Sequence, residues 1–443
     1  MLKTKHYKRV LSSLVWLFLG AVATKAQTGN YLSAEQARNQ AMQNNAHIRL
    51  SDIEHKIHQN EYEQSAAAFL PQISASYGIA VTNHPLNAFG FLLQQGGVTQ
   101  ASFDPAKLNN PDPKANFSIG ADIRMSLFDQ ETRYARKAAK LKAESYQHKT
   151  QYTRNYIGYE TDKAYTQLQF SYLSEKILLE TLEDMKTICQ TVENFKRQGL
   201  AQEADVLNAK VQISTIESAI AKARSGIENA SEGLKVLMGM EISDNNVFTT
   251  DSLAVITPST ELPQLSLLRS DVMAMQLANK ASQAMVKSAE KAFLPKINAF
   301  GNFQFNNDNV IGFKQDAFMV GINLNWTIYD GKLRKNKLSS NKLQTVKMQE
   351  DLDRYITEKQ AEMNQTHRNL IAMETEMKKQ EASIRHATEV LRIQQNRYKE
   401  GLISTNDLLA AQAQLSKERL SHAQTIMQYN ITIHYQNFIT ANK

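Results

Sequence analysis

The stretch FLPQI, Phe69 to Ile73, separates two kinds of sequence pattern. Before it, apolar residues recur with the 3.6-residue period of a helix, and after it they alternate with polar residues as in a strand with one apolar face. The segment FLPKI, Phe293 to Ile297, shows the same change later in the chain. A proline ring cannot continue the helical hydrogen-bond ladder and favours extended geometry in the preceding residue. We therefore predict a joint between a helix and a strand at Pro71 and at Pro295.

The two segments belong to an internal duplication of the chain. FLPQI and FLPKI lie 224 residues apart, but two later islands match at offsets of 201 and 202, so the connection after the first alternating run is about 23 residues longer in the first half. The islands pair Phe117-Ser-Ile-Gly, Leu127-Phe-Asp and Arg133 with Phe318-Met-Val-Gly, Ile328-Tyr-Asp and Arg334, and then Gly199-Leu200, Asp205 and Leu207 with Gly401-Leu402, Asp407 and Leu409. We predict a first repeat over residues 27–240, a linker over 241–262 and a second repeat over 263–443. Each repeat reads helix, strand, loop, strand, very long helix, turn and helix.

Four alternating runs have the length of tilted strands that cross a bilayer, which need about ten residues each. They cover about residues 72–83, 116–128, 296–306 and 317–329, with Phe300 as an apolar exception on the polar face. A soluble sheet with one buried face is the alternative. Four strands alone cannot close into a barrel, however, and two edges would lack partners. Several copies of the chain would then have to share one barrel.

The helices are unusually long. The first is predicted from Ser33, in a Ser-Ala-Glu-Gln capping box, to about Ala68. From Gly331 to Glu400 the chain has no proline and no further glycine, which predicts a rod of roughly 100 Å. The apolar residues that recur there at steps of seven, as in a coiled-coil seam, are Ile356, Met363, Leu370, Met377, Ile384, Leu391 and Tyr398. Cys189, the only cysteine, aligns with Leu391, so we expect a packed small hydrophobe.

Residues 1–26 have the layout of a secretory signal peptide: a basic start, an apolar stretch over 10–23 and small residues before a cut after Ala26. This segment carries five positive charges, so its removal lowers the net charge from +7 to +2. The basic balance of the whole chain is therefore largely a property of the signal, and we expect no nucleic-acid partner.

Taken together, the signal peptide, the duplication, the paired strands and the rod-like helices resemble the TolC-like outer-membrane efflux proteins, the outer-membrane factors of tripartite efflux or type I secretion systems. The resemblance covers essentially the whole mature chain. It is carried by Tyr31-Leu32-Ser33 with Ala37, Ala41 and Asn45, by Phe69-Leu70-Pro71 and Phe293-Leu294-Pro295, by Leu127-Phe128-Asp129 and Ile328-Tyr329-Asp330, and by Gly199-Leu200, Asp205-Val206-Leu207, Tyr398, Gly401-Leu402 and Asp407-Leu408-Leu409.

The resemblance implies a fold that is mainly α, with a membrane β-barrel portion. A homotrimer would form a 12-stranded barrel, four strands per chain, surrounded by outer-membrane lipid, and a long α-helical barrel in the periplasm of a Gram-negative bacterium. Loops 83–116 and 306–317 would face outside the cell. The channel would conduct passively and need no cofactor. Its partners would be a periplasmic adaptor (membrane fusion protein) and an inner-membrane pump of RND or ABC type. The sequence specifies neither the pump class nor the exported substrate.

The resemblance also assigns roles to the two Gly-Leu turns that connect each long helix to its return helix. Gly199-Leu200 and Gly401-Leu402 would form periplasmic tips that contact the adaptor. Asp205, Tyr398 and Asp407 are candidate residues of the gate that keeps the tunnel closed. The family's basic gate partner falls at Ile403 here, and a second acidic position falls at Ala410. We therefore expect a constriction that is closed by apolar packing, with fewer salt links.

Other classes of function have weaker support. The sequence shows no nucleophile–base pair, phosphate loop or other catalytic motif, so we expect no enzyme activity. His55 and His58 have a spacing that can bind zinc, but the carboxylates and amides around them favour a solvated helix face. A secreted or periplasmic coiled-coil scaffold or adaptor without a channel is the main alternative. It would explain the heptads, but not four strands at matching places in two repeats.

Overall fold

The computed structural model describes residues 30–242, 246–257 and 265–440. The predicted signal peptide and parts of the predicted linker lie outside the described residues. The chain divides into two compact units, each of which takes residues from both predicted repeats. Unit 1 comprises Met1–Asn45, Ile157–Ser259 and Asn369–Tyr435, and unit 2 comprises Ala46–Tyr156, Thr260–Arg368 and Gln436–Lys443.

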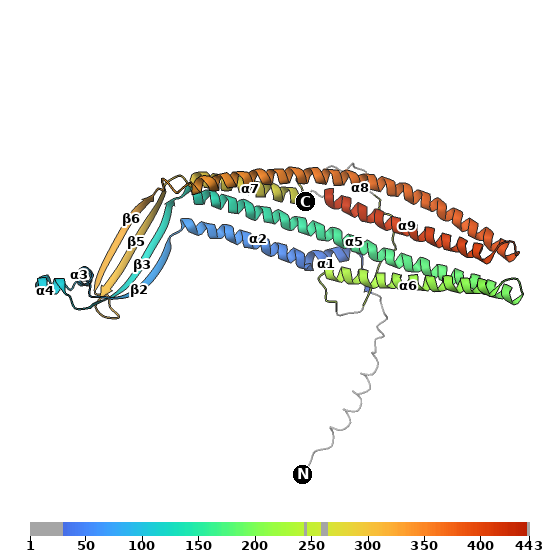
Figure 1. The fold of residues 1–443 in the computed structure, drawn as a ribbon, viewed down its shortest axis with the longest axis horizontal. Coiled ribbons are helices and arrows are strands. Elements are labelled where there is room, and N and C mark those ends of the chain that lie inside the picture. The colour runs from blue at the N-terminus through green and yellow to red at the C-terminus, as the bar shows by residue number, and fades with distance from the viewer. Residues whose placement is uncertain (1–29, 243–245, 258–264, 441–443) are drawn as a thin grey trace, which may run out of the picture. The chain divides into compact units, whose positions relative to one another are not determined.

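Unit 2 contains a four-stranded antiparallel sheet (Figure 1). Its strands are β2 (Gln72–Thr82), β3 (Lys114–Phe128), β5 (Lys296–Asn307) and β6 (Gln315–Asn325), in the order β2-β3-β5-β6. The central β3–β5 pairing joins the two repeats, and β2 and β6 are the edges. The prediction of four strands per chain is therefore confirmed.

The last strand ends earlier than predicted, at Asn325 instead of about residue 329. The residues after it are used in the joint with the helices. The indole nitrogen of Trp326 donates to the Phe293 carbonyl at 3.0 Å, and Arg334 donates to the Thr327 carbonyl at 2.6 Å. These contacts hold the backbone away from the sheet, which alternation in the sequence could not reveal.

The register places the large apolar residues of all four strands on one face, except Phe300 and Met319, which lie on the polar face. Ile73 lies opposite Ile123, and Phe303 lies opposite both Ala121 and Phe318. This face is not covered by other described residues of the chain. On the two edge strands, the exposed fractions of its large apolar residues range from 50% for Tyr77 to 76% for Val320. The alternative of a soluble sheet with one buried face would need such a cover. The exposed apolar residues are Ile73, Tyr77, Ile79, Val81, Ile123, Leu127, Phe303, Phe318, Val320, Ile322 and Leu324.

Phe300 lies on the polar face, as predicted, and the register explains it. Its partner across the β5–β6 pair is Gly321, and a Cβ added there would come within 2.7 Å of the Phe300 ring. The ring therefore occupies the space that a side chain at Gly321 would need, as aromatic residues do when they cover a strand glycine.

The predicted first helix, Ser33 to about Ala68, is wrong in one respect because it is broken at Asn45. α1 (Ala34–Asn44) begins with the expected capping box, and α2 (Ala46–Gln64) is followed by the 3₁₀ helix η1 (Ser65–Phe69). Asn45 is extended, and its side-chain amide donates to the Leu237 carbonyl at 2.8 Å. This long-range bond satisfies a buried polar group at the break.

The long helices are α5 (Gln130–Arg197) and α8 (Leu333–Lys399), of 68 and 67 residues, and their return helices are α6 (Glu203–Leu237) and α9 (Thr405–Thr440). α7 (Ser270–Lys291) precedes the second joint. Of the heptad residues, Met363, Leu370, Met377, Leu391 and Tyr398 are buried. Cys189 is buried in the same cluster as Leu391, as predicted. Within the described ranges, no helix has the length and the apolar character needed to cross a membrane.

Smaller elements complete the two units. In unit 1, β1 (Asn30–Tyr31) pairs in parallel with β4 (Phe248–Thr249). In unit 2, the β2–β3 connection carries α3 (Pro85–Gln94), the 3₁₀ helix η2 (Gln100–Phe103) and α4 (Pro105–Asn109). Sequence reasoning had predicted only a long exposed loop at this position.

A buried ion pair lies at the start of α7 in unit 2. The Arg269 guanidinium donates to both oxygens of the Asp271 carboxylate, at 3.0 and 2.5 Å, and also to the Ile439 carbonyl. The Tyr355 hydroxyl donates to the same carboxylate at 2.7 Å. Burial opposes ionisation of Asp271, but the bonds from Arg269 and Tyr355 outweigh it, so the pKa of Asp271 is below its ordinary value. The group thus joins α7, α8 and the end of α9.

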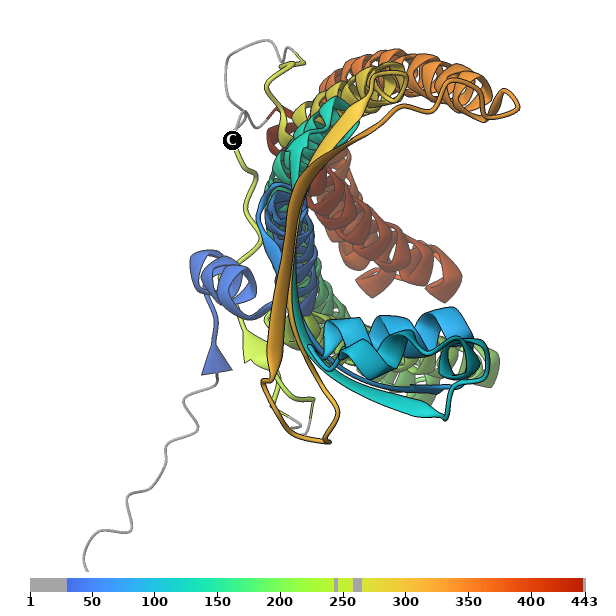
Figure 2. The same ribbon diagram turned by 90° about the vertical axis from the view of Figure 1, so that its left-hand side faces the viewer.

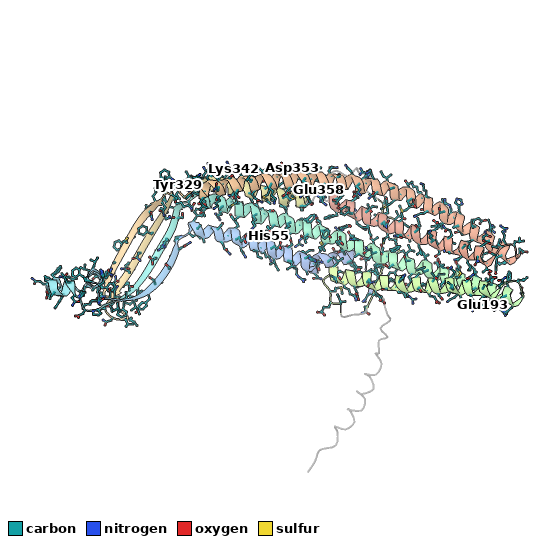
Figure 3. The ribbon with its side chains drawn as sticks, in the orientation of Figure 1. His55, Glu193, Tyr329, Lys342, Asp353 and Glu358 are labelled. Atoms are coloured by element: carbon teal, nitrogen blue, oxygen red, sulfur yellow. The ribbon has the colours of Figure 1, made fainter. Side chains whose placement is uncertain are left out.

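Asp271→Asn is expected to lower the free energy of unfolding by about 3 kcal/mol, because it leaves the Arg269 charge buried and unpaired. The stabilisation is full above the unfolded carboxyl pKa of about 4 and is lost as pH falls through the lower folded pKa. Urea titration in detergent at several pH values measures both effects. Asp353→Asn, at an exposed site on α8 (Figure 3), is the matched control and should cost less than about 0.5 kcal/mol. An equal effect of the two substitutions would contradict the prediction.

Candidate functional site

The two Gly-Leu turns have the same backbone geometry in unit 1. Gly199 and Gly401 adopt left-handed φ angles of +80° and +70°, which favour glycine. The N–H of Leu200 donates to the Phe195 carbonyl at 2.8 Å, and that of Leu402 donates to the Arg397 carbonyl at 2.9 Å. These are the six-to-one bonds that close a helix C-terminus in a Schellman motif. Leu200 and Leu402 themselves are exposed, at 70% and 64%. Each turn therefore presents one apolar side chain to solvent.

Asp205 and Asp407 stabilise the helices that follow the turns. Asp205 accepts the backbone N–H of Gln202 at 2.9 Å, and Asp407 accepts the N–H and the hydroxyl of Ser404 at 3.2 and 2.8 Å. Both are acidic residues in the first helical turn, where the helix dipole also favours negative charge. Within the single chain, both carboxylates are thus already used for capping.

Tyr398 is buried beside these turns. Its ring stacks on Phe195, with centroids 5.2 Å apart, and its hydroxyl lies 3.0 Å from the Thr405 hydroxyl. Burial raises the pKa of the phenol, and the Asp205 charge adds to this. Ile403 packs against the same apolar cluster, whereas Ala410 is exposed.

The structure therefore brings Tyr398 and Ile403 together with two partners that sequence reasoning missed. Phe195 and Thr405 carried no recognisable signal, because an aromatic residue near a helix end and a threonine after a turn are both common. The cluster also contains Met185, Ile188, Cys189, Val192, Val206, Ala209, Leu391, Leu408, Leu409 and Leu415. Through these apolar side chains, the helical hairpin α5–α6 packs against the helical hairpin α8–α9.

In unit 2, each proline of the opening motif lies between a helix and a strand. Pro71 stands between η1 and β2, and Pro295 stands between α7 and β5. Ion pairs surround the second of these joints. Lys296 pairs with Asp129 at 3.0 Å and with Glu131 at 2.9 Å, and Arg334 pairs with Asp330 at 2.6 Å.

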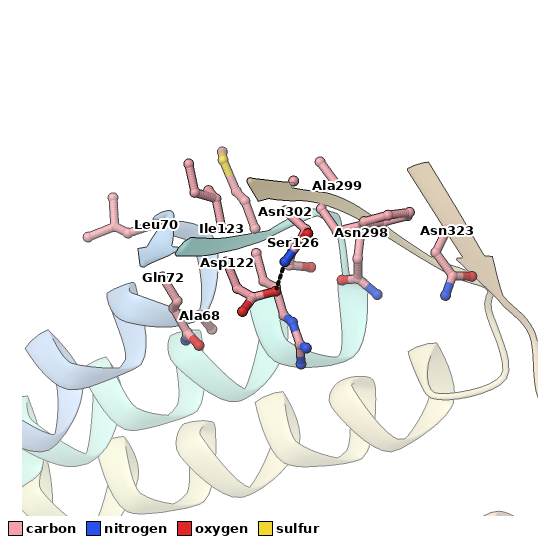
Figure 4. A pocket seen from close by; sticks show the side chains of 14 residues that line it. Ala68, Leu70, Gln72, Asp122, Ile123, Ser126, Asn298, Ala299, Asn302 and Asn323 are labelled. Atoms are coloured by element: carbon pink, nitrogen blue, oxygen red, sulfur yellow. Dashed lines mark hydrogen bonds between the residues drawn. The ribbon is translucent and has the colours of Figure 1, made fainter. Parts of the chain in front are cut away.

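The polar face of the sheet forms a depression of about 490 Å³ next to these joints (Figure 4). Its polar lining consists of the amides Gln72, Asn298, Asn302 and Asn323, the hydroxyl of Ser126 and the charged residues Asp122 and Arg124. Asn302 donates to the Asp122 carboxylate at 3.1 Å, and Asn298 and Asn323 lie nearby. Such a surface is suited to contact water and polar solutes.

The histidines of α2 take part in local contacts. His58 bonds to Glu61 at 2.8 Å and packs on the Tyr146 ring, with centroids 3.8 Å apart. His55 is half-exposed on the same helix (Figure 3). In the part of the chain that the structure describes, no group of three or more histidine, cysteine or acidic residues could hold a metal ion.

Comparisons with known proteins agree with this architecture. The chain is 21% identical to the outer membrane protein TolC of Salmonella enteritidis over 78% of this chain and 68% of that one. It is 27% identical to the cation efflux system protein CusC of Escherichia coli over 31% of this chain. That match spans only 30% of the length of CusC. Among solved structures, the Campylobacter jejuni CmeC outer membrane channel superposes with a TM-score of 0.79 at 16% identity, over 92% of this chain and 85% of that one.

The model of the family described as Outer membrane efflux protein matches residues 37–240 and 262–435. These two stretches contain the sheet, the long helices and both Gly-Leu turns. The resemblance noted in the sequence is thereby confirmed: the chain belongs to the outer membrane efflux protein family, whose members are channel proteins and not enzymes.

Proposed function

We propose that this protein is the outer-membrane channel of a tripartite efflux or secretion system. Three copies would form the channel, which passively conducts substrates from a periplasmic adaptor and an inner-membrane pump to the outside. The observation that carries the proposal is the sheet of unit 2. It exposes one continuous apolar face, and the outer side of each 11-residue edge strand has no strand partner among the described residues.

The chemistry of the sheet favours a shared barrel over a scaffold. Unpaired strand edges are costly in lipid, where every backbone polar group must be satisfied, and closure with other copies removes them. β2 of one copy would pair with β6 of the next, which gives twelve strands for three copies. The apolar face would then contact outer-membrane lipid and the polar face would line the lumen. A coiled-coil scaffold without a channel gives no reason for this exposed apolar face.

The helices would form the periplasmic α-barrel, as in the family. The energy for export would come from the pump, of RND or ABC type, so the channel itself needs no cofactor. The gene neighbourhood would identify that pump and its adaptor.

Cell fractionation tests the proposal directly. The protein should stay with the outer membrane after salt and alkaline washes and should need detergent for release, because the apolar face is in lipid. After purification, chemical cross-linking should yield a trimer, and reconstitution in a planar bilayer should yield channels. Recovery of a soluble monomer from the envelope would contradict the proposal and favour the scaffold.

We further propose that the tips close by apolar packing around Tyr398. Tyr398→Phe and Asp205→Ala should then leave bilayer conductance at the wild-type closed level, because neither removes the packed ring. Tyr398→Ala should raise the open fraction, since it deletes a buried aromatic side chain worth about 3 kcal/mol or more. An increase in conductance with Asp205→Ala alone would instead indicate a salt-linked latch.

The exposed leucines of the turns are proposed as adaptor contacts. Leu200→Asp combined with Leu402→Asp should reduce co-purification of the cognate adaptor by roughly tenfold or more, because exposed apolar anchors contribute strongly to interfaces. Leu86→Asp, at an equally exposed position on α3, is the matched control and should have no effect. Unchanged adaptor recovery with both tip substitutions would show that these turns are not the contact.

A further inference from the structure

The two hairpin connections of the sheet differ greatly. β5 and β6 are joined by residues 308–314 alone, whereas residues 83–113 between β2 and β3 form an insertion with three short helices. The insertion is folded: Ala88 is 1% exposed, and the Phe89 and Phe103 rings pack edge to face with centroids 5.7 Å apart. In Figure 1, α3 and α4 extend beyond the ends of the strands.

Gln95, at the end of α3, anchors the insertion to the sheet. The side chain is 4% exposed, and its amide nitrogen lies 2.7 Å from the Ala115 carbonyl, 3.0 Å from the Asn116 side-chain oxygen and 3.2 Å from the Asn307 carbonyl. Asn116 in turn donates to the Asn306 side chain at 2.9 Å. These buried polar groups satisfy one another, so the network is rigid while it is complete and costly to break.

The anchor determines which face of the sheet the insertion covers. Asn116 and Asn306 alternate in register with Phe117 and Phe305, so their side chains belong to the polar face. Gly96 continues over the same face, because a Cβ there would lie 2.9 Å from the side-chain oxygen of Gln315, the first residue of β6. Figure 2 is viewed from the left-hand side of Figure 1, and it shows α3 and α4, in blue and cyan, on one side of the strands. In a closed barrel, the polar face is the inside.

We propose that the α3–α4 insertion, residues 83–113, narrows the outer mouth of the channel and sets the largest solute that can pass it. Gln95 is the positioning residue that holds the insertion over the polar face. The inference rests on the proposed channel function, and it adds a size limit that the chain itself supplies at the exit. Three copies would bring three insertions to one opening.

The test measures access from outside intact cells to a single cysteine on the polar face. Asn298→Cys is placed in a Cys189→Ser background and treated with maleimides coupled to polymers of increasing size. The smallest reagent should label it in every variant. The largest should be excluded when the insertion is intact, and should react roughly tenfold faster when Gln95→Ala breaks the anchor and frees the insertion to open locally.

Further variants separate positioning from general damage. Gln95→Glu keeps the shape but removes the donor, so it should behave like Gln95→Ala. Gln100→Ala, at an exposed position of the same insertion, should retain the wild-type size limit. Replacement of residues 83–113 by the sequence of 308–314 should remove the limit altogether. Heat stability of the detergent-solubilised trimer should be the same for Gln95→Ala and wild type.

Two results would overturn the inference, and they are distinguishable. Equal labelling by the largest reagent in wild type and in all insertion variants would show that the insertion does not limit the mouth, while the channel proposal stands. Val320→Cys, on the apolar face, should resist a membrane-impermeant maleimide. If it reacted as fast as Asn298→Cys, the apolar face would not be in lipid, and the channel proposal itself would fail.

Discussion

The backbone hydrogen bonds of the two edge strands are the constraint on which the rest of the structure depends. β2 and β6 each run for 11 residues, and each is bonded to a neighbour on one side only. In water such edges invite aggregation, and in lipid they are very costly, so only closure with other copies satisfies them fully. In the proposed barrel, the alternation of apolar and polar residues then decides which face would meet lipid and which would meet water. The proposed trimeric channel rests on these two requirements together with family membership.

The features that the sequence predicted are those set by local chemistry. Prolines at 71 and 295 end helices before strands, Gly199 and Gly401 supply left-handed residues at the turns, and heptads identify the buried seam of α8. The features it missed depend on distant partners. The break at Asn45 depends on the Leu237 carbonyl, the early end of β6 on the Phe293 carbonyl, and the folded β2–β3 insertion on Gln95 and the two asparagines it meets. No local sequence pattern indicates such contacts. The sequence therefore predicts one continuous helix, a longer last strand and a long exposed loop.

The connections between the second strand and the long helix occupy matching positions in the two repeats but differ in their ion pairs. Asp129 and Asp330 occupy equivalent places after the second strand of each repeat, yet Asp129 pairs with Lys296 from the other repeat, whereas Asp330 pairs with Arg334 from its own helix. Arg334 also donates to the Ala292 carbonyl and lies over the Phe293 ring. Its equivalent, Arg133, is exposed. The connection after β3 thus ties the two repeats together, whereas Arg334, after β6, bonds within its own repeat.

The contacts at the proposed constrictions form within one chain, whereas the proposed channel wall requires several copies. At the turns of unit 1, Asp205, Asp407 and the Tyr398 hydroxyl bond within one chain, and the packing around Tyr398 is complete without a neighbour. In the insertion of unit 2, Gln95 and its asparagine partners likewise satisfy one another within one chain. The strand edges, in contrast, are left open. In the proposed channel, the packing at the tips and the anchor of the insertion would thus form within each chain, whereas the strand edges would require neighbouring copies. Substitutions at Tyr398 or Gln95 should accordingly alter passage without preventing the trimer from forming, whereas changes at the edge strands should act on assembly first.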